Sequence, residues 1–456
     1  MNFKYAVLNV LLGLLFVSHN LSAQVQMPSF KDSKQIKSLN GIWKFKYIPS
    51  SDLGSDVSFY NTNFDLSKWA NIKVPGNWEL QGFAEPVYGK KLKNGTGLYS
   101  TNFTVPADWE KNPVYIAFDG VQSGYSLWVN GNFAGEFASA FNRQTFDISK
   151  FVNPGKTNTL AVKVITQPKG WEFDTNDDWS LAGIFRDVTL FSLPQVHLND
   201  VTIKTFVNKS NASISVEAVV EKTAKKFSKN LKLFGELIDA KGKLVKTVTI
   251  VADSKQPQTD FLNFTEKITV EKPQLWSAEN PYLYTLRLSL KDNDTEIQRR
   301  TENVGIREIS WADGILKLNG APIKLKGVNH HDLSPVNGRA ITDAELKEDL
   351  ALMRKANVNF IRLCHYPPQP RLLQLCDSLG FYLMDEVPYG YGDELLNDVS
   401  YLPILKQRAK STIWRDKNHP SVIIWSVGNE NPVTEIGLET GRYVKTLDRT
   451  RPYCFP

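Results

Sequence analysis

Polar residues that can handle protons follow a buried strand in the C-terminal third of the chain. The run Val422–Val427 is β-branched and aromatic and carries no charge, as expected for a strand that is covered on both faces. It leads directly into Asn429 and Glu430. Three earlier apolar segments also end in polar residues, at Asn329–Asp332, at His365-Tyr366 and at Asp385-Glu386. Because the carboxyl ends of the strands in a β/α barrel meet at one face, we expect these groups to form one site there.

Several kinds of chemistry could use such a face. A metal site could be assembled from His330, His331, Asp332 and His365, but the chain has no HExxH motif and the histidines come from different strands. The sequence also contains no GxSxG motif for a serine esterase and no GxGxxG or P-loop motif for a nucleotide. Carboxylates among aromatic and polar side chains fit glycoside hydrolysis better, in which one acid protonates the leaving oxygen and a second carboxylate attacks the anomeric carbon.

Helical segments alternate with these strands. Thr342 and Glu345 form a capping box at the start of one helix, and a second helix from about residue 370 stops at Gly380. We predict the remaining helices at 402–416 and 435–447, and strands at 323–328, 358–363, 381–384, 422–427 and 453–454. This alternation predicts that residues 306–456 form the first half of a (β/α)8 TIM barrel.

Two all-β domains precede the barrel. Residues 24–195 contain short apolar or alternating runs between turn signals such as Asn40-Gly41 and Asn130-Gly131, which predicts a jelly-roll β-sandwich, and the loops of this domain are the candidates for sugar binding. Residues 196–305 alternate more plainly, and their length suits an immunoglobulin-like β-sandwich. This second domain carries no cluster of acids, histidines or cysteines, so a spacer role is favoured.

The first 23 residues have the features of a secretory signal peptide. Lys4 supplies the positive region, Ala6–Val17 the apolar core, and Leu21-Ser22-Ala23 the small-residue cleavage site. This apolar run is too short to cross a bilayer, and no later segment is long enough. We therefore predict an exported chain, periplasmic or secreted, without a membrane span.

Composition and charge narrow the partners. The formal net charge is +6 and the Lys and Arg residues are scattered, so we predict no nucleic-acid partner. The expected partner is an oligosaccharide or polysaccharide substrate, and oligomerisation stays open. Cys364, Cys376 and Cys454 lie in apolar or strand-like segments, so we predict buried thiols rather than a disulfide framework.

Several segments together resemble glycoside hydrolase family 2, the family of β-galactosidases, β-glucuronidases and β-mannosidases. They are LNGIWKF (39–45), VPGNWELQG (74–82), GLYSTNFTVP (97–106), FDGVQSGYSLWVNG (118–131), AGIFRDV (182–188), GIREI (305–309), LKGVNHHD (325–332), IRLCHYP (361–367) and WSVGNE (425–430). The resemblance runs from about residue 38 to the end. It implies an exo-β-glycosidase that removes a non-reducing-end sugar with retention of configuration.

The resemblance implies roles for residues at the strand ends. Glu430 would be the catalytic general acid/base, and Asn429 would bind the sugar 2-hydroxyl. Arg362 resembles the arginine that orients the nucleophile, and His331 and His365 resemble the histidines that hold other sugar hydroxyls.

A loop of the first domain contributes two more predicted substrate-binding residues. Asp177 matches the aspartate that reaches into the barrel and holds the terminal sugar, and Trp179 stands where an aromatic wall is common in the family. From the residues alone, this loop could equally be a solvated turn.

Two departures separate the chain from the metal-dependent galactosidases. Those enzymes carry a Glu and a His that bind magnesium after the position of Asp385-Glu386, whereas this chain has VPYGYG at 387–392. An Asn of the first domain is also replaced near Lys90. We therefore expect no metal and no cofactor, and a β-glucuronide slightly preferred over a β-galactoside.

The family supplies the nucleophilic Glu from strand 7, whereas this sequence stops at Pro456, after the predicted fifth strand. Asp385 and Glu386 are expected to be supporting carboxylates. Two functions follow. One is a retaining exo-β-glycosidase of family 2 that acts in polysaccharide degradation and takes its nucleophile from outside these residues. The other is a truncated, catalytically inactive carbohydrate-binding remnant of such an enzyme.

Overall fold

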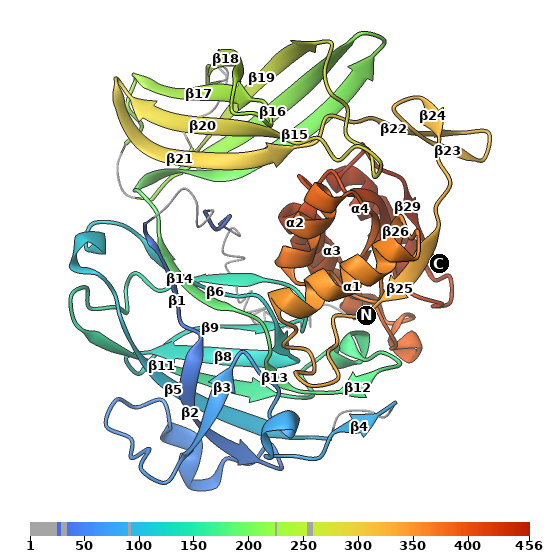
Figure 1. The fold of residues 1–456 in the computed structure, drawn as a ribbon. Coiled ribbons are helices and arrows are strands. Elements are labelled where there is room, and N and C mark those ends of the chain that lie inside the picture. The colour runs from blue at the N-terminus through green and yellow to red at the C-terminus, as the bar shows by residue number, and fades with distance from the viewer. Residues whose placement is uncertain (1–24, 29–33, 90–92, 224–225, 253–258) are drawn as a thin grey trace, which may run out of the picture.

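Two β-sandwiches and a parallel β/α sheet follow one another along the chain (Figure 1). The computed structural model describes residues 25–28, 34–89, 93–223, 226–252 and 259–456. The predicted signal peptide and Lys90 lie outside the described residues. The predicted fold class is confirmed: a jelly-roll sandwich, an immunoglobulin-like sandwich and part of a TIM barrel. Within the described part, none of the helices combines the length and the apolar character that crossing a bilayer requires.

The first sandwich packs a four-stranded antiparallel sheet against a six-stranded one. The smaller sheet has the order β1 (Ile36–Ser38), β14 (Val188–Ser192), β6 (Val114–Phe118), β10 (Gln144–Asp147). The larger has the order β3 (Ala70–Val74), β2 (Gly41–Ile48), β5 (Thr96–Thr104), β11 (Thr157–Ile165), β8 (Gly124–Val129), β9 (Asn132–Ala138). Inward-facing side chains of both sheets, among them Trp43, Phe45, Phe118 and Leu190, form one core.

Two short ladders at one end of this sandwich carry the loops that face the barrel. They pair β12 (Trp179–Ser180) with β4 (Val87–Tyr88), and β13 (Gly183–Ile184) with β7 (Val121–Gln122). The backbone pairing of Trp179 with Tyr88 fixes the loop that contains the predicted sugar-binding residues.

The second sandwich is built from longer strands. One sheet has the order β15 (Val196–Asn208), β16 (Asn211–Lys222), β19 (Phe261–Glu271), and the other β18 (Leu244–Ile250), β17 (Leu231–Ile238), β20 (Tyr284–Asp292), β21 (Thr295–Val304). Buried and half-buried residues alternate along β16 and β17, as the sequence pattern predicts.

The barrel part contains one parallel five-stranded sheet. Its order is β25 (Gly327–His330), β26 (Phe360–Leu363), β27 (Tyr382–Val387), β28 (Val422–Val427), β29 (Tyr453–Cys454). The helices are α1 (Asp343–Lys355), α2 (Pro370–Leu379), α3 (Leu402–Asp416) and α4 (Glu435–Leu447). Leucines of α1 and α2 pack on the face that presents Leu363 and Val427.

Local signals in the barrel part act as the sequence predicts, with one exception. The Thr342–Glu345 capping box is present, and Gly380 ends α2 with a φ of 81°. The strand predicted at 323–328 is wrong, because β25 begins only at Gly327. The apolar Ile323 and Leu325 instead pack beside Trp276, and this burial explains their hydrophobicity without strand pairing.

An antiparallel sheet that the sequence reading missed precedes β25. It consists of β22 (Ile309–Ala312), β23 (Ile315–Leu318) and β24 (Ala321–Pro322).

The prediction that all three cysteines are buried is correct for Cys364 and Cys376, whereas Cys454 is half-buried, and all three are free thiols.

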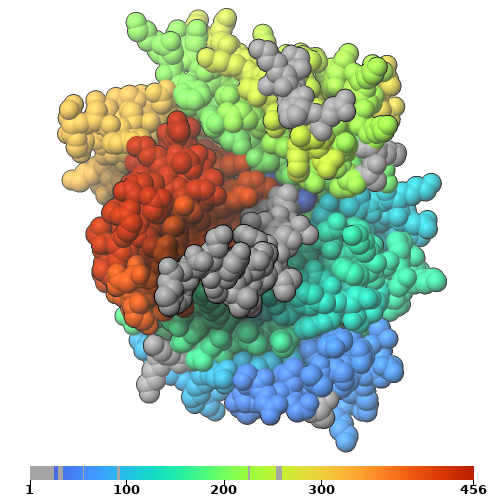
Figure 2. Space-filling model, turned by 180° about the vertical axis from the view of Figure 1, so that it is seen from behind, coloured from blue at the N-terminus to red at the C-terminus, as the bar shows by residue number. Residues whose placement is uncertain are grey.

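The barrel part packs against both sandwiches (Figure 2). Arg408 of α3 donates to Asp174 of the jelly roll at 2.8 Å, and both side chains are buried. On the other side, Arg307, three residues after the last strand of the second sandwich, donates to the carbonyl oxygens of Pro420 at 2.7 Å and Val422 at 2.8 Å. These bonds hold the jelly-roll loops and the strand ends in fixed relation.

Candidate active site

Glu386 is the centre of the hydrogen-bond network at the strand ends. Its side chain is 0% exposed. One carboxylate oxygen accepts from Arg362 Nη2 at 2.9 Å and from Ser426 Oγ at 2.8 Å, and the other lies 2.9 Å from His365 Nδ1. These contacts fix the carboxylate and the three side chains around it, so Glu386 supports the site rather than facing a substrate.

Asn429 extends this network to the next strand end. Arg362 Nη2 donates to Asn429 Oδ1 at 2.9 Å, so one guanidinium joins Glu386 to the predicted 2-hydroxyl ligand. The structure therefore brings Arg362, His365 and Asn429 together, as the sequence predicts for one face of the barrel.

Glu430 stands on a sharp turn after β28. Gly428 has a φ of 84°, and Glu430 itself has a φ of 55°, a region that side chains other than glycine seldom adopt. Its backbone N–H donates to the carbonyl of Pro456 at 3.2 Å, and the residue is exposed. The turn thus presents the carboxyl of Glu430 to solvent, where a general acid has to meet a leaving group.

Asn431 holds this turn, and the sequence reading missed it. Its Oδ1 accepts from the backbone N–H of Asn429 at 2.9 Å. Its Nδ2 donates to the carbonyl of Gly390 and to Asp393 Oδ1, both at 2.8 Å. One buried side chain therefore ties the Asn429-Glu430 turn to the loop after β27. The sequence did contain a signal for this role, because an Asn side chain often stabilises a turn by hydrogen-bonding to the nearby backbone.

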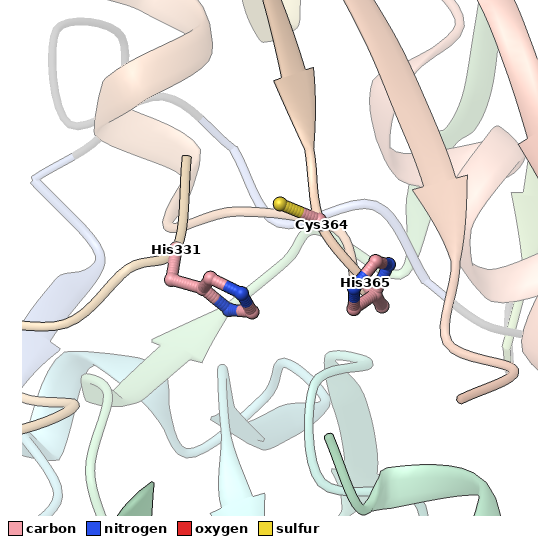
Figure 3. A group of neighbouring side chains, drawn as sticks. All are labelled: His331, Cys364 and His365. Carbon is pink, nitrogen blue, oxygen red and sulfur yellow. The ribbon is translucent and has the colours of Figure 1, made fainter. Parts of the chain in front are cut away.

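His331 lies beside His365, as predicted, and their ring centroids are 5.6 Å apart (Figure 3). His331 Nδ1 is 3.3 Å from the Tyr366 hydroxyl and 3.6 Å from Asp178 Oδ2. Burial lowers the pKa of His331, an effect that the charge of Asp178 opposes. Partial burial of both rings leaves them accessible from the open side of the sheet.

The jelly-roll loop supplies two adjacent acids in different settings. Asp178 is buried and its Oδ1 pairs with Arg339 Nη2 at 3.0 Å, whereas Asp177 is exposed. Burial raises the pKa of Tyr391, and the charges of Asp177 and Glu430 raise it further. Both carboxylates therefore lie in the electrostatic neighbourhood of Tyr391. The sequence reading gave no role to Asp178, since adjacent acids cannot be told apart without the fold.

Trp179 remains 42% exposed beside these acids. Its ring stands edge to face with Tyr88, with centroids 5.6 Å apart. An exposed aromatic ring at this position can stack on the apolar face of a sugar. Its role in binding stays a prediction.

The loop at 387–392 does not fit a magnesium ion. A Cβ atom at Gly390 would lie 2.3 Å from the carbonyl oxygen of Thr175 and 2.7 Å from Asn176 Oδ1. Gly390 N–H also donates to the carbonyl of Phe173 at 3.0 Å. The jelly-roll loop therefore occupies the space that a metal-binding side chain would need, and neither Gly390 nor Gly392 offers a side-chain oxygen or nitrogen.

Two β-sandwiches followed by a barrel segment with acids, amides and imidazoles at its strand ends define the class of multidomain glycosyl hydrolases. Three family models match along the chain: the sugar binding domain of glycosyl hydrolases family 2 at 36–194, a further model of glycosyl hydrolases family 2 at 196–307, and the TIM barrel domain of that family at 309–455. The chain belongs to family 2 of the glycosyl hydrolases.

The chain is similar to known β-galactosidases and to known β-glucuronidases. A β-galactosidase of Halalkalibacterium halodurans is 34% identical over 445 residues, which cover 91% of this chain and 43% of the relative. The solved β-glucuronidase of Bacteroides uniformis is 27% identical with a TM-score of 0.79, covering 92% of this chain and 52% of that one. A solved family 2 member of Bacteroides cellulosilyticus is 28% identical with a TM-score of 0.78, covering 92% and 55%. The chain thus spans less than half the length of the curated relative.

Proposed function

We propose that these residues provide the acid/base and the sugar-binding groups of a retaining exo-β-glycosidase. The observation that carries the proposal is the exposed Glu430 on a turn that Asn431 fixes, next to the Arg362–Asn429 bond. Glu430 would protonate the leaving oxygen and later activate water. Asn429 would bind the 2-hydroxyl, a contact that strengthens in the transition state.

The remaining groups would hold the terminal sugar. His331 and His365 offer ring nitrogens from the next strand ends, and Asp177 and Trp179 approach from the jelly-roll loop. Because the jelly-roll loop is bonded to the barrel through Asp178 and Arg339, this wall of the site is fixed before substrate arrives. Fixed positioning lowers the entropy that binding has to overcome.

The second carboxylate of the retaining pair is not Glu386 in this proposal. Retention needs two carboxyl groups about 5–5.5 Å apart on opposite sides of the anomeric carbon. Glu386 is closed to solvent by its bonds to Arg362, His365 and Ser426. We therefore assign the nucleophile to a family strand that follows β29.

We propose a terminal β-glucuronide as the substrate, slightly ahead of a β-galactoside. Support for the first comes from the stretch 387–392, which has neither the Glu nor the His that binds magnesium in metal-dependent galactosidases, and from likeness to a solved β-glucuronidase. Support for the second comes from identity to a β-galactosidase.

We also propose that the chain is exported, periplasmic or secreted, and takes part in polysaccharide degradation.

A second candidate function is sugar binding without hydrolysis. The closed environment of Glu386 favours it, because Glu430 alone cannot complete a retaining double displacement.

One experiment separates the two functions. Hydrolysis of 4-nitrophenyl β-D-glucuronide and β-D-galactoside is measured for a chain extended through the strand proposed to carry the nucleophile, and for Glu430→Gln and the exposed control Glu435→Gln in that extended chain. Turnover that falls only in Glu430→Gln supports the glycosidase. Absent turnover with glucuronate or galactose binding that Asp177→Asn weakens supports the binding protein. Neither turnover nor binding contradicts both.

A further inference from the structure

A thiol and two imidazoles converge at the ends of β25 and β26. One donor atom from each of His331, Cys364 and His365 lies within 4.8 Å of the other two (Figure 3). The two rings face the space between them, and the sulfur lies above it. Neither the glycosidase chemistry nor the sugar contacts proposed above use the thiol.

Groups behind the histidines orient them as a metal centre requires. His365 Nδ1 is held by Glu386 at 2.9 Å, which leaves Nε2 to bind another partner. His331 Nδ1 is near the Tyr366 hydroxyl and Asp178. Histidines that bind metals almost always have the second ring nitrogen bonded to a carboxylate, carbonyl or water, which sets the tautomer. His365 meets that condition through Glu386, whereas His331 Nδ1 is bonded to the Tyr366 hydroxyl and lies 3.6 Å from the Asp178 carboxylate, beyond hydrogen-bond distance.

We propose that His331, Cys364 and His365 bind one borderline-soft divalent cation of the Zn²⁺ class, and that this ion excludes the sugar from the site. An N₂S donor set selects Zn²⁺ and Co²⁺ over Mg²⁺ or Ca²⁺, which prefer oxygen. Three protein ligands leave a fourth tetrahedral position open for water. The second half of the proposal rests on the proposed function, since the same histidines are assigned to sugar hydroxyls.

The geometry needs only small adjustments. Zn–N bonds of about 2.0–2.1 Å and Zn–S bonds of about 2.3 Å place tetrahedral donors about 3.3–3.6 Å apart. The donors therefore close by at most about 1.5 Å, which rotation of the half-buried His331 ring can supply while His365 stays bonded to Glu386.

Binding of the ion releases one proton from the protein. The ion displaces the thiol proton of Cys364 to solvent, while both imidazoles bind as neutral ligands. Burial, and next the charge of Glu386, raises the pKa of the Cys364 thiol to about 11. The same negative charge favours a cation. The nearby guanidiniums of Arg362 and Arg339 are already paired, with Glu386 and Asp178 respectively.

Direct binding tests the site without reference to activity. The chain is titrated with Co²⁺, and the near-ultraviolet thiolate-to-cobalt band is followed. We expect one ion per chain, loss of the band in Cys364→Ser, and at least tenfold weaker binding in His331→Gln, whose half-buried side chain can change without loss of the fold. The thiol control Cys454→Ser should bind as the parent does. An absent band, or a band that Cys454→Ser abolishes, overturns the site.

Competition tests the exclusion of sugar. Zn²⁺ should weaken binding of glucuronate or galactose by the chain at least tenfold, in a way that chelator reverses and Cys364→Ser removes. Zn²⁺ bound at this site with unchanged sugar affinity overturns the exclusion. Because Co²⁺ binding needs no turnover, failure of the proposed function leaves the metal test decisive.

Discussion

Asp178 of the jelly-roll loop and Arg339 of the barrel part form a buried ion pair, with 3.0 Å between Oδ1 and Nη2. Arg339 also donates to the carbonyl oxygen of Trp179 at 3.2 Å, so this arginine holds the loop at Asp178 and at the residue that follows it. Its neighbour Asp177 is exposed, and the negative charge of Asp177 helps to raise the pKa of Tyr391. One acid therefore holds the loop in place, and the other is available to a sugar.

The two adjacent acids should respond differently to amide substitution. Asp178→Asn leaves Arg339 without its carboxylate, so it should lower the free energy of unfolding by about 3–5 kcal/mol, as breaking a buried pair does. Asp177→Asn should leave the melting temperature unchanged and weaken sugar binding about tenfold or more. Calorimetry and a binding titration check the pair of variants, and a reversed pattern would move the sugar contact to Asp178.

Glu430→Gln should act through the leaving group. In the active enzyme, loss of the acid should slow substrates with poor leaving groups by about 10²–10⁴-fold, whereas aryl glycosides with good leaving groups need little protonation and should lose less. Rates on a series of aryl glycosides check this, with Glu435→Gln as the control. Equal loss across the series would remove Glu430 from the acid role.

Asn431→Ala should misplace the acid without touching it. The substitution removes three hydrogen bonds and frees the turn that holds Asn429 and Glu430. A misplacement of about 1 Å can cost about 10²-fold in rate, so kcat should fall by that order. The exposed Asn397→Ala, in the loop after β27, is the matched control. An unchanged kcat would show that the turn holds its shape through the backbone alone.

Chelation should spare activity. Gly390 and Gly392 offer no side-chain donors, and the carbonyl of Thr175 blocks the space beside Gly390. Rates measured before and after EDTA dialysis should agree within error. A rate that falls with EDTA and returns with magnesium would show that other residues provide the ligands.

Stability should depend on pH through Glu79. Burial is the main cause that raises the pKa of this carboxyl from its ordinary value of 4.5 to about 7. The folded state therefore binds this proton more tightly than the unfolded state. The stabilisation is complete below about pH 4.5 and is lost as pH rises through about 7.

Glu79→Gln should remove that dependence. Gln retains an acceptor for the N–H of Ala182, which lies 2.9 Å from Glu79 Oε2. The variant should match the parent at pH 4 and exceed it at pH 8 by about 3 kcal/mol, from about 1.4 kcal/mol per pKa unit. Denaturant unfolding across this range provides the measurement. A difference that does not vary with pH would contradict the assignment.

Sequence patterns predicted the strands of the parallel sheet well where a buried apolar run is also hydrogen-bonded to a neighbouring strand. The strand Val422–Val427 and the short strand at Tyr453-Cys454 match to the residue, and β28 pairs with β27 on one side and with β29 on the other. The run at 323–328 also carries apolar residues but contains two lysines, and its Ile323 and Leu325 pack beside Trp276 instead of pairing in the parallel sheet. Hydrophobicity reports burial, and it does not distinguish these two ways of being buried.

The candidate site was predictable only in part. Residues at strand ends, such as Arg362, His365 and Asn429, share a face because parallel strands share a direction. Asp178 and Asn431 depend on partners far along the chain, Arg339 and Gly390, and no local pattern encodes those contacts. Asp178 is buried and Asp177 is exposed only because the jelly-roll loop packs against the barrel part.

The buried pair of Asp174 and Arg408 has a consequence for how such proteins can diversify. Exchanging the jelly roll for one without a matching acid would leave Arg408 buried without its partner charge, at a cost of about 3–5 kcal/mol. The jelly roll is therefore matched to this barrel part and is not freely interchangeable with another sugar-binding domain. A recombination event that exchanges it between relatives would have to carry matching residues in both segments, so specificity in this lineage should evolve by substitution within loops rather than by module exchange.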